Sequence, residues 1–135
     1  MRSLTTTVGG LVCLAALGAA GCASPKYVHA VFFTCKPGTP DSEIDALVAD
    51  GYKLLSKVPS VRKLDSGRRD PGADREVNVK DYDVGLLVHF DDRKGCDQYT
   101  DHPLHQQYVE KHKPYWSQVR VCDFVPRRWE IVSRP

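Results

Sequence analysis

The residues from Tyr99 to His105, in the sequence YTDHPLH, bring a phenol and two imidazoles together around a single proline. A phenol and an imidazole can exchange protons near neutral pH, which suits them to general acid/base chemistry. Pro103 has no backbone N–H and a fixed φ, which the first position of a helix tolerates and its interior does not. We therefore expect one helix to end near Tyr99 and another to begin at Pro103, with a bend that directs Tyr99 and His105 towards the same space. The alternative is that these groups only satisfy polar atoms at the bend.

The elements that must position these groups follow from the rest of the chain. Strands are expected over 26–36, 61–69, 82–90 and 118–125, and helices over 40–57 and from 91 to 113, the second divided at the proline. Thr39 is expected to cap the first helix, with Pro40 at its first position. Residues 70–73 are a turn-rich break, and 74–80 a polar loop or strand extension. The order β-α-β-β-α-β is the ferredoxin-like pattern of an α+β fold.

The N-terminal residues have the composition of a secretory signal peptide. Arg2 precedes a run of 13 small and apolar residues, 8–20, whereas a helix needs about 20 to span a bilayer. Two adjacent glycines argue against a buried core helix. The sequence AAGC that ends at Cys22 resembles a bacterial lipobox, in which the cysteine is diacylated and becomes the mature N-terminus. We expect residues 1–21 to be a lipoprotein signal peptide and 22–26 a short tether, so that the protein is exported and anchored to a membrane of the bacterial cell envelope.

Composition excludes several classes of function. The chain has 19 Lys and Arg and 17 Asp and Glu; residues 1–21 contain one arginine, which leaves 18 and 17 and a net charge of +1. A chain with so small a net charge lacks the clustered basic surface that nucleic-acid binding requires. No glycine-rich phosphate loop, nucleophile elbow or paired-carboxylate site is visible. His102, His105 and His112 lack a carboxylate or thiolate at ligand spacing, so we expect no metal and no cofactor.

These elements and motifs resemble the stress-responsive A/B barrel (Dabb) family. The matching marks are the first strand Val28-His29-Ala-Val-Phe-Phe, Gly67, Tyr82-Asp83, Tyr99-x-x-His102-Pro103-x-His105 and the closing Val121-Cys122-Asp123-Phe124. The segment around Pro103 is the specific part. The likeness covers about residues 27–125, which we take as the domain, with 126–135 as a C-terminal tail.

The resemblance implies a dimeric α+β barrel, in which two subunits pack four-stranded sheets face to face with the helices outside. Some plant members are polyketide cyclases, in which a Tyr and a His of this motif act in a pocket between sheet and helices. Those positions are Tyr99 and His105 here. The walls of the pocket would be His29, Val31, Phe33, Leu86, His102 and Trp116. For His29, a buried core histidine is the alternative.

Alternation along the strands agrees with such a dimer. The helices would be faced by His29, Val31, Phe33, Cys35, Val84, Leu86, Val88 and Phe90. The opposite face would carry Ala30, Phe32, Thr34, Leu87, His89, Arg120, Cys122 and Phe124. This second set is too apolar for open solvent, so we expect a second copy of the chain to cover it.

Three cysteines remain once Cys13 is cleaved away and Cys22 is lipidated. Thiols of exported proteins tend to pair. We expect the strand before the second helix to run parallel to the first strand, which puts Cys96 at the same end of the sheet as Cys35. A Cys35–Cys96 disulfide is the prediction, because Cys122 lies on the other face. The alternative is three small buried hydrophobic side chains.

Two functions remain open at this stage. The first is a lipid-anchored Dabb protein of the envelope that is stress-associated or binds a small apolar or aromatic ligand without catalysis. The second is an acid/base enzyme of polyketide-cyclase or lyase type, with His105 as base and Tyr99 as its hydrogen-bond partner. An enclosed pocket with both side chains in mutual reach would favour the enzyme, and a filled core the binding or structural role.

Overall fold

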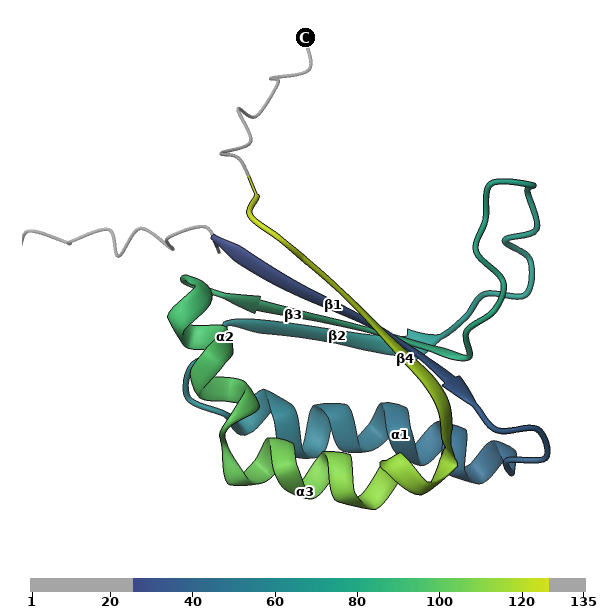
Figure 1. The fold of residues 1–135 in the computed structure, drawn as a ribbon, viewed down its shortest axis with the longest axis horizontal. Coiled ribbons are helices and arrows are strands. Elements are labelled where there is room, and N and C mark those ends of the chain that lie inside the picture. Colours follow the sequence, from purple (N-terminus) through teal and green to yellow (C-terminus); the bar gives the residue numbers. More distant parts are fainter. Residues whose placement is uncertain (1–25, 127–135) are drawn as a thin grey trace, which may run out of the picture.

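The computed structural model describes residues 26–126 (Figure 1). The elements are β1 (Tyr27–Cys35), α1 (Asp41–Leu54), the 3-10 turn η1 (Leu55–Lys57), β2 (Lys63–Arg68), β3 (Val84–Phe90), α2 (Arg93–Thr100), α3 (Pro103–His112), the 3-10 turn η2 (Lys113–Tyr115) and β4 (Trp116–Phe124). The predicted order of strands and helices is confirmed. The predicted signal peptide, the predicted lipidation site Cys22 and nearly all of the C-terminal tail lie outside the described residues. Within 26–126, no helix has the length and apolar character needed to cross a membrane.

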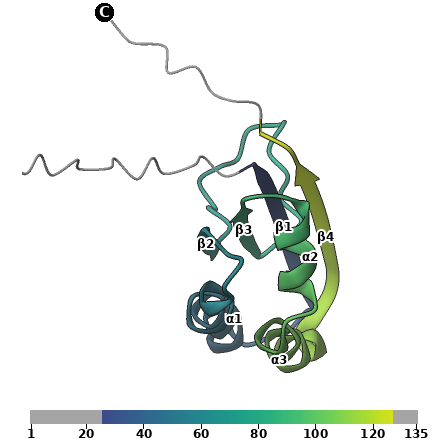
Figure 2. The ribbon, with the colours of Figure 1, turned by 90° about the vertical axis from the view of Figure 1, so that its left-hand side faces the viewer.

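The four strands form one antiparallel sheet in the order β2-β3-β1-β4. All three helices lie on one face of this sheet, and the other face carries no helix (Figures 1 and 2). This is the ferredoxin-like α+β fold. The core is formed by apolar residues between sheet and helices, among them Phe33, Leu47, Leu86 and Phe90. Burial of this apolar surface drives the helices onto one face of the sheet.

The chain bends between α2 and α3 as the proline predicts. The Asp92 carboxylate caps α2 by accepting a hydrogen bond from the Gly95 N–H at 2.8 Å, and Pro103 is the first residue of α3. The expected cap of α1 is wrong, since Pro40 holds that position without a side-chain hydrogen bond. The Thr39 hydroxyl instead donates to the Lys36 carbonyl.

The predicted Cys35–Cys96 disulfide is also wrong. Both thiols are free, and so is Cys122. Strand β3 runs antiparallel to β1, so Phe90, the last residue before α2, pairs with Tyr27 at the start of β1. Cys96 therefore lies at the opposite end of the sheet from Cys35. Cys35 lies eight positions after Tyr27 along β1, a distance of roughly 26 Å. A disulfide requires Cα atoms within about 7 Å.

One polar cluster is buried between α1 and α3. The Asp50 carboxylate accepts hydrogen bonds from His112 Nε2 at 3.0 Å and from Lys111 Nζ at 2.5 Å through the same oxygen, Oδ2. His112 is 1% exposed and Asp50 is 7% exposed. Beside them the Tyr108 hydroxyl donates to the Leu47 carbonyl at 3.1 Å. These contacts tie the two long helices together beneath the sheet.

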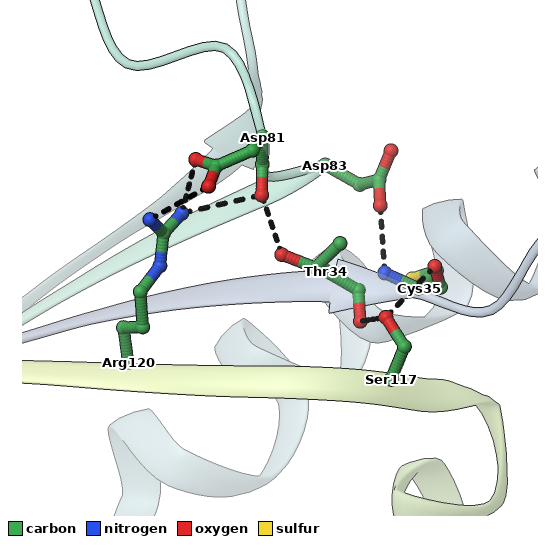
Figure 3. A network of polar contacts seen from close by, with 6 residues as sticks. All are labelled: Thr34, Cys35, Asp81, Asp83, Ser117 and Arg120. Carbon is green, nitrogen blue, oxygen red and sulfur yellow. Dashed lines mark hydrogen bonds and ion pairs between the residues drawn. The ribbon is translucent and has the colours of Figure 1, made fainter.

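The long loop between β2 and β3, residues 69–83, rises from the sheet on the side away from the helices (Figure 1). Its last residues are held by a polar network at the end of β1 (Figure 3). Arg120 of β4 pairs with Asp81 at 2.7 Å, the Thr34 hydroxyl donates to the Asp81 carbonyl, and the Cys35 N–H donates to Asp83. The base of the loop is thereby fixed relative to the sheet.

Candidate functional site

A cavity of about 240 Å³ lies between the α2–α3 bend and strands β1 and β4. Its apolar walls are Val31, Phe33, Leu86, Tyr108, Val109, Trp116, Val119 and Val121. Its polar lining is contributed by His29, Tyr99, Thr100 and His105. A mostly apolar hollow with a few convergent polar groups is the usual form of a small-molecule site.

The bend brings Tyr99 and His105 into contact, with ring centroids 4.6 Å apart. Tyr99 is in the last turn of α2 and His105 in the first turn of α3, so the two rings approach from helices on either side of the bend. The His29 ring, from β1, lies 5.9 Å from the Tyr99 ring in an edge-to-face arrangement. Tyr99 thus lies between two imidazoles at one wall of the cavity.

His29 is oriented by a carboxylate that the sequence analysis did not identify. Its Nδ1 lies 2.7 Å from Oδ1 of Asp123 on β4, and the Tyr27 hydroxyl donates to Oδ2 of the same carboxylate at 3.2 Å. Because a carboxylate only accepts, Nδ1 of His29 donates to Asp123, and this contact fixes the orientation of the ring. Side chains alternate along β4, so Asp123 and Val121 point to the same face of the sheet as His29, whereas Cys122 and Phe124 point to the opposite face. This alternation could have indicated from the sequence that Asp123 faces the site.

Burial sets the protonation of the two rings at the bend. It lowers the pKa of His105 below its usual 6.5, an effect that Thr100 partly opposes and His29 reinforces. Burial also raises the pKa of Tyr99 well above its usual 10, and nearby Cys96 adds to this. At neutral pH the site therefore presents a neutral imidazole that can accept a proton and a phenol that can donate a hydrogen bond.

Most of the residues named from the sequence surround this one cavity. His102 does not: it is the N-cap of α3, where its Nδ1 accepts from the Leu104 N–H at 3.2 Å. That position directly before Pro103 turns the ring to the helix terminus. Val119 and Val121 also line the cavity, and neither was among the pocket residues named from the sequence. No group of three His, Cys, Asp or Glu side chains in residues 26–126 is arranged to hold a metal.

The family model for the stress responsive A/B barrel domain (Dabb) matches residues 28–126. The chain belongs to the Dabb family. A Dabb-family protein of ferredoxin-like fold from Mesorhizobium loti is 26% identical, with a TM-score of 0.63 and coverage of 77% of this chain and 99% of that one. No functionally curated protein matches the chain.

Other solved structures share the Dabb fold at lower identity. A dimeric ferredoxin-like protein of unknown function from Thermobifida fusca is 20% identical, with a TM-score of 0.65 and coverage of 76% of this chain and 92% of that one. A hydroxynitrile lyase from Passiflora edulis is 17% identical, with a TM-score of 0.64 and coverage of 78% and 97%. At these identities the likeness establishes the fold alone.

Proposed function

We propose that this Dabb protein binds a small aromatic or apolar molecule bearing a carbonyl or hydroxyl oxygen, and that it does so as a homodimer anchored by lipid in the bacterial cell envelope. The observation that supports binding is the cavity itself. Its walls are apolar, and its polar lining offers the Tyr99 hydroxyl as donor and His105 as acceptor. A filled core would have no room for such a ligand.

Ligand binding can be measured through Trp116, which lines the cavity. We expect an aryl ketone such as 4-hydroxyacetophenone to quench its fluorescence in a Trp129→Phe background, in the mature chain with Cys22→Ser, and toluene to bind more weakly. His105→Gln should weaken binding of the ketone about tenfold, the value of one hydrogen bond in a desolvated site. His102→Asn is the matched control, because it removes a nearby histidine outside the cavity and keeps a good N-cap. Equal affinity of parent and His105→Gln for the ketone would contradict the proposal.

Acid/base catalysis of cyclase or lyase type is the second candidate function. The observation that favours it is the contact between Tyr99 and a neutral His105 beside the cavity. A base and a hydrogen-bond donor at one wall can remove a proton next to a carbonyl and stabilise the oxyanion that forms. The hydroxynitrile lyase with the same fold is compatible with such chemistry on this scaffold.

A second copy of the chain is the proposed cover of the open sheet face. That face carries Ala30, Phe32 and Leu87 without a helix over them, and related structures are described as dimeric. Leu87→Glu should yield monomer in analytical ultracentrifugation of the mature chain, because it places two carboxylates in the dimer interface. Val121→Glu is the control, since that residue is exposed on the other side of the sheet. A parent that sediments as monomer at micromolar concentration would refute the dimer.

Anchoring through Cys22 is the proposed attachment to the membrane. Four residues, 23–26, separate Cys22 from β1, so the domain would lie within roughly 14 Å of the head groups. Two or more acyl chains give stable anchoring where one does not. We expect the full-length protein to fractionate with membranes and Cys22→Ser to appear in the soluble fraction. Equal membrane association of both proteins would exclude this anchor.

A further inference from the structure

The open face of the sheet has its large side chains on one half and its small ones on the other. One row across the sheet runs Gly67 on β2, Gly85 on β3, Phe32 on β1 and Arg120 on β4. The β2–β3 half of this row has no side chains, whereas the β1–β4 half has two of the largest. In the next row Leu87 of β3 lies beside Ala30 of β1, so the order of sizes is reversed there.

The two glycines leave a hollow in this face. It measures about 240 Å³ and is lined by Ala30, Phe32, Asp65, Ser66, Gly67, Gly85, Leu86 and Leu87. A Cβ added at Gly67 would meet nothing within 4 Å, and one at Gly85 would lie 3.9 Å from ring atoms of Phe32 and Tyr82. Neither glycine has a positive φ, so no backbone conformation requires either. A cavity of about 150 Å³ already holds benzene, so this hollow can accept a phenyl side chain.

We infer that this hollow is the socket for Phe32 of a second copy of the chain, an inference that rests on the homodimer proposed above. A two-fold axis along the strands lays the β1–β4 half of each copy on the β2–β3 half of the other. Phe32 of the second copy then covers Gly85, and Leu87 meets Ala30. Each large side chain thus faces a small one, and the two-fold symmetry repeats every contact.

The other two-fold axis in the plane of the interface is disfavoured by charge. An axis across the strands would lay β2 on β2 in opposite directions and set Lys63 towards Arg69, which directly follows the strand. Like charges brought together at an interface cost several kcal/mol. The loop 69–83 rises on the same side as the hollow, and its base is fixed by the Arg120–Asp81 pair (Figures 1 and 3).

The test moves the large side chain from one side of the contact to the other in two variants of the mature chain with Cys22→Ser. Phe32→Ala removes the side chain that enters the socket, and Gly85→Leu fills the socket. Each alone should raise the dimer dissociation constant at least about 30-fold, as expected for a central anchor. Mixed, they should form a heterodimer, because the leucine of one chain faces the alanine of the other in one half of the interface, and the parental contact between Phe32 and Gly85 is kept in the other half.

Further variants keep the result interpretable. Gly67→Val narrows the same socket where nothing crowds the new side chain, so it should weaken the dimer while circular dichroism shows a folded monomer. Phe124→Ala is the matched control, a 51% exposed phenylalanine at the corner of the same face. If the parent is a dimer but the mixture gives no heterodimer, or Phe32→Ala weakens it no more than Phe124→Ala, the socket is refuted and the dimer stands. A monomeric parent refutes the dimer itself.

Discussion

Asp50→Ala is expected to lower the free energy of unfolding by about 3 kcal/mol at pH 7, because it leaves the buried His112 ring without its hydrogen-bond acceptor and removes the partner of the Lys111 ammonium. His112, at 1% exposure, has Asp50 as its hydrogen-bond acceptor, and the carboxylate also binds the Lys111 ammonium. The pair joins α1 to α3, and α3 carries His105. The loss is therefore expected to loosen the wall of the cavity as well.

Urea denaturation followed by circular dichroism measures this change. Lys111→Ala is the control, since the ammonium side chain is half exposed and an exposed ion pair contributes at most about 1 kcal/mol. Asp50→Asn should fall between the two, because the amide oxygen can still accept from His112. A loss below about 1 kcal/mol for Asp50→Ala would show that the cluster does not hold the helices together.

The same cluster gives the stability a defined dependence on pH. Burial lowers the pKa of His112 despite the opposing effect of Asp50, so the unfolded chain binds a proton at a higher pH than the folded one. Stability is then complete above about pH 6.5 and falls as the pH drops towards the lowered folded value. His112→Gln should reduce this loss between pH 7 and 5. His89 and His105, whose pKa values are also lowered, account for the remainder.

The fold could be read from the sequence because its signals are local. A helix tolerates Pro103 at its first position and not in its interior, and the alternation in β1 and β3 sorts side chains onto two faces. The bend and the core therefore followed directly from the sequence. Strand direction is a long-range property. The expectation that β3 runs parallel to β1 was wrong because the chain reverses direction through the loop 69–83, so that β3 runs antiparallel to both β2 and β1. The disulfide between Cys35 and Cys96 failed with it.

The candidate site was predictable only as far as it depends on these elements. Tyr99, His105 and His29 meet because the bend and β1 place them together. The His102 side chain could either cap α3 or line the cavity, and the residue type alone does not decide between these two positions. Asp123 reaches His29 through the register of β4 against β1, a pairing of residues 94 positions apart. The local sequence pattern predicts which face of the sheet such a residue occupies, but it does not predict which residue of another strand it contacts.

The acid/base candidate predicts the largest functional effect, at His105. If His105 is a base, the mature chain should speed the exchange of the methyl protons of 4-hydroxyacetophenone in deuterium oxide, and His105→Gln should slow that exchange at least about 100-fold. The proton passes from the methyl carbon to the His105 imidazole, and the enolate oxygen accepts a hydrogen bond from Tyr99. Tyr99→Phe should cost at least about tenfold, because one donor to a developing oxyanion is lost while the buried ring remains.

Proton NMR follows the exchange, and its pH profile separates catalysis from a structural role. Because burial lowers the pKa of His105, the neutral ring persists below pH 6.5, and the rate should stay level from pH 8 to about 6.5 before it falls. His102→Asn should leave both the rate and the profile unchanged. Exchange no faster than in buffer, or unaffected by His105→Gln, would leave the cavity as a binding site. His105 would then contribute affinity and no chemistry, which the quenching of Trp116 measures independently.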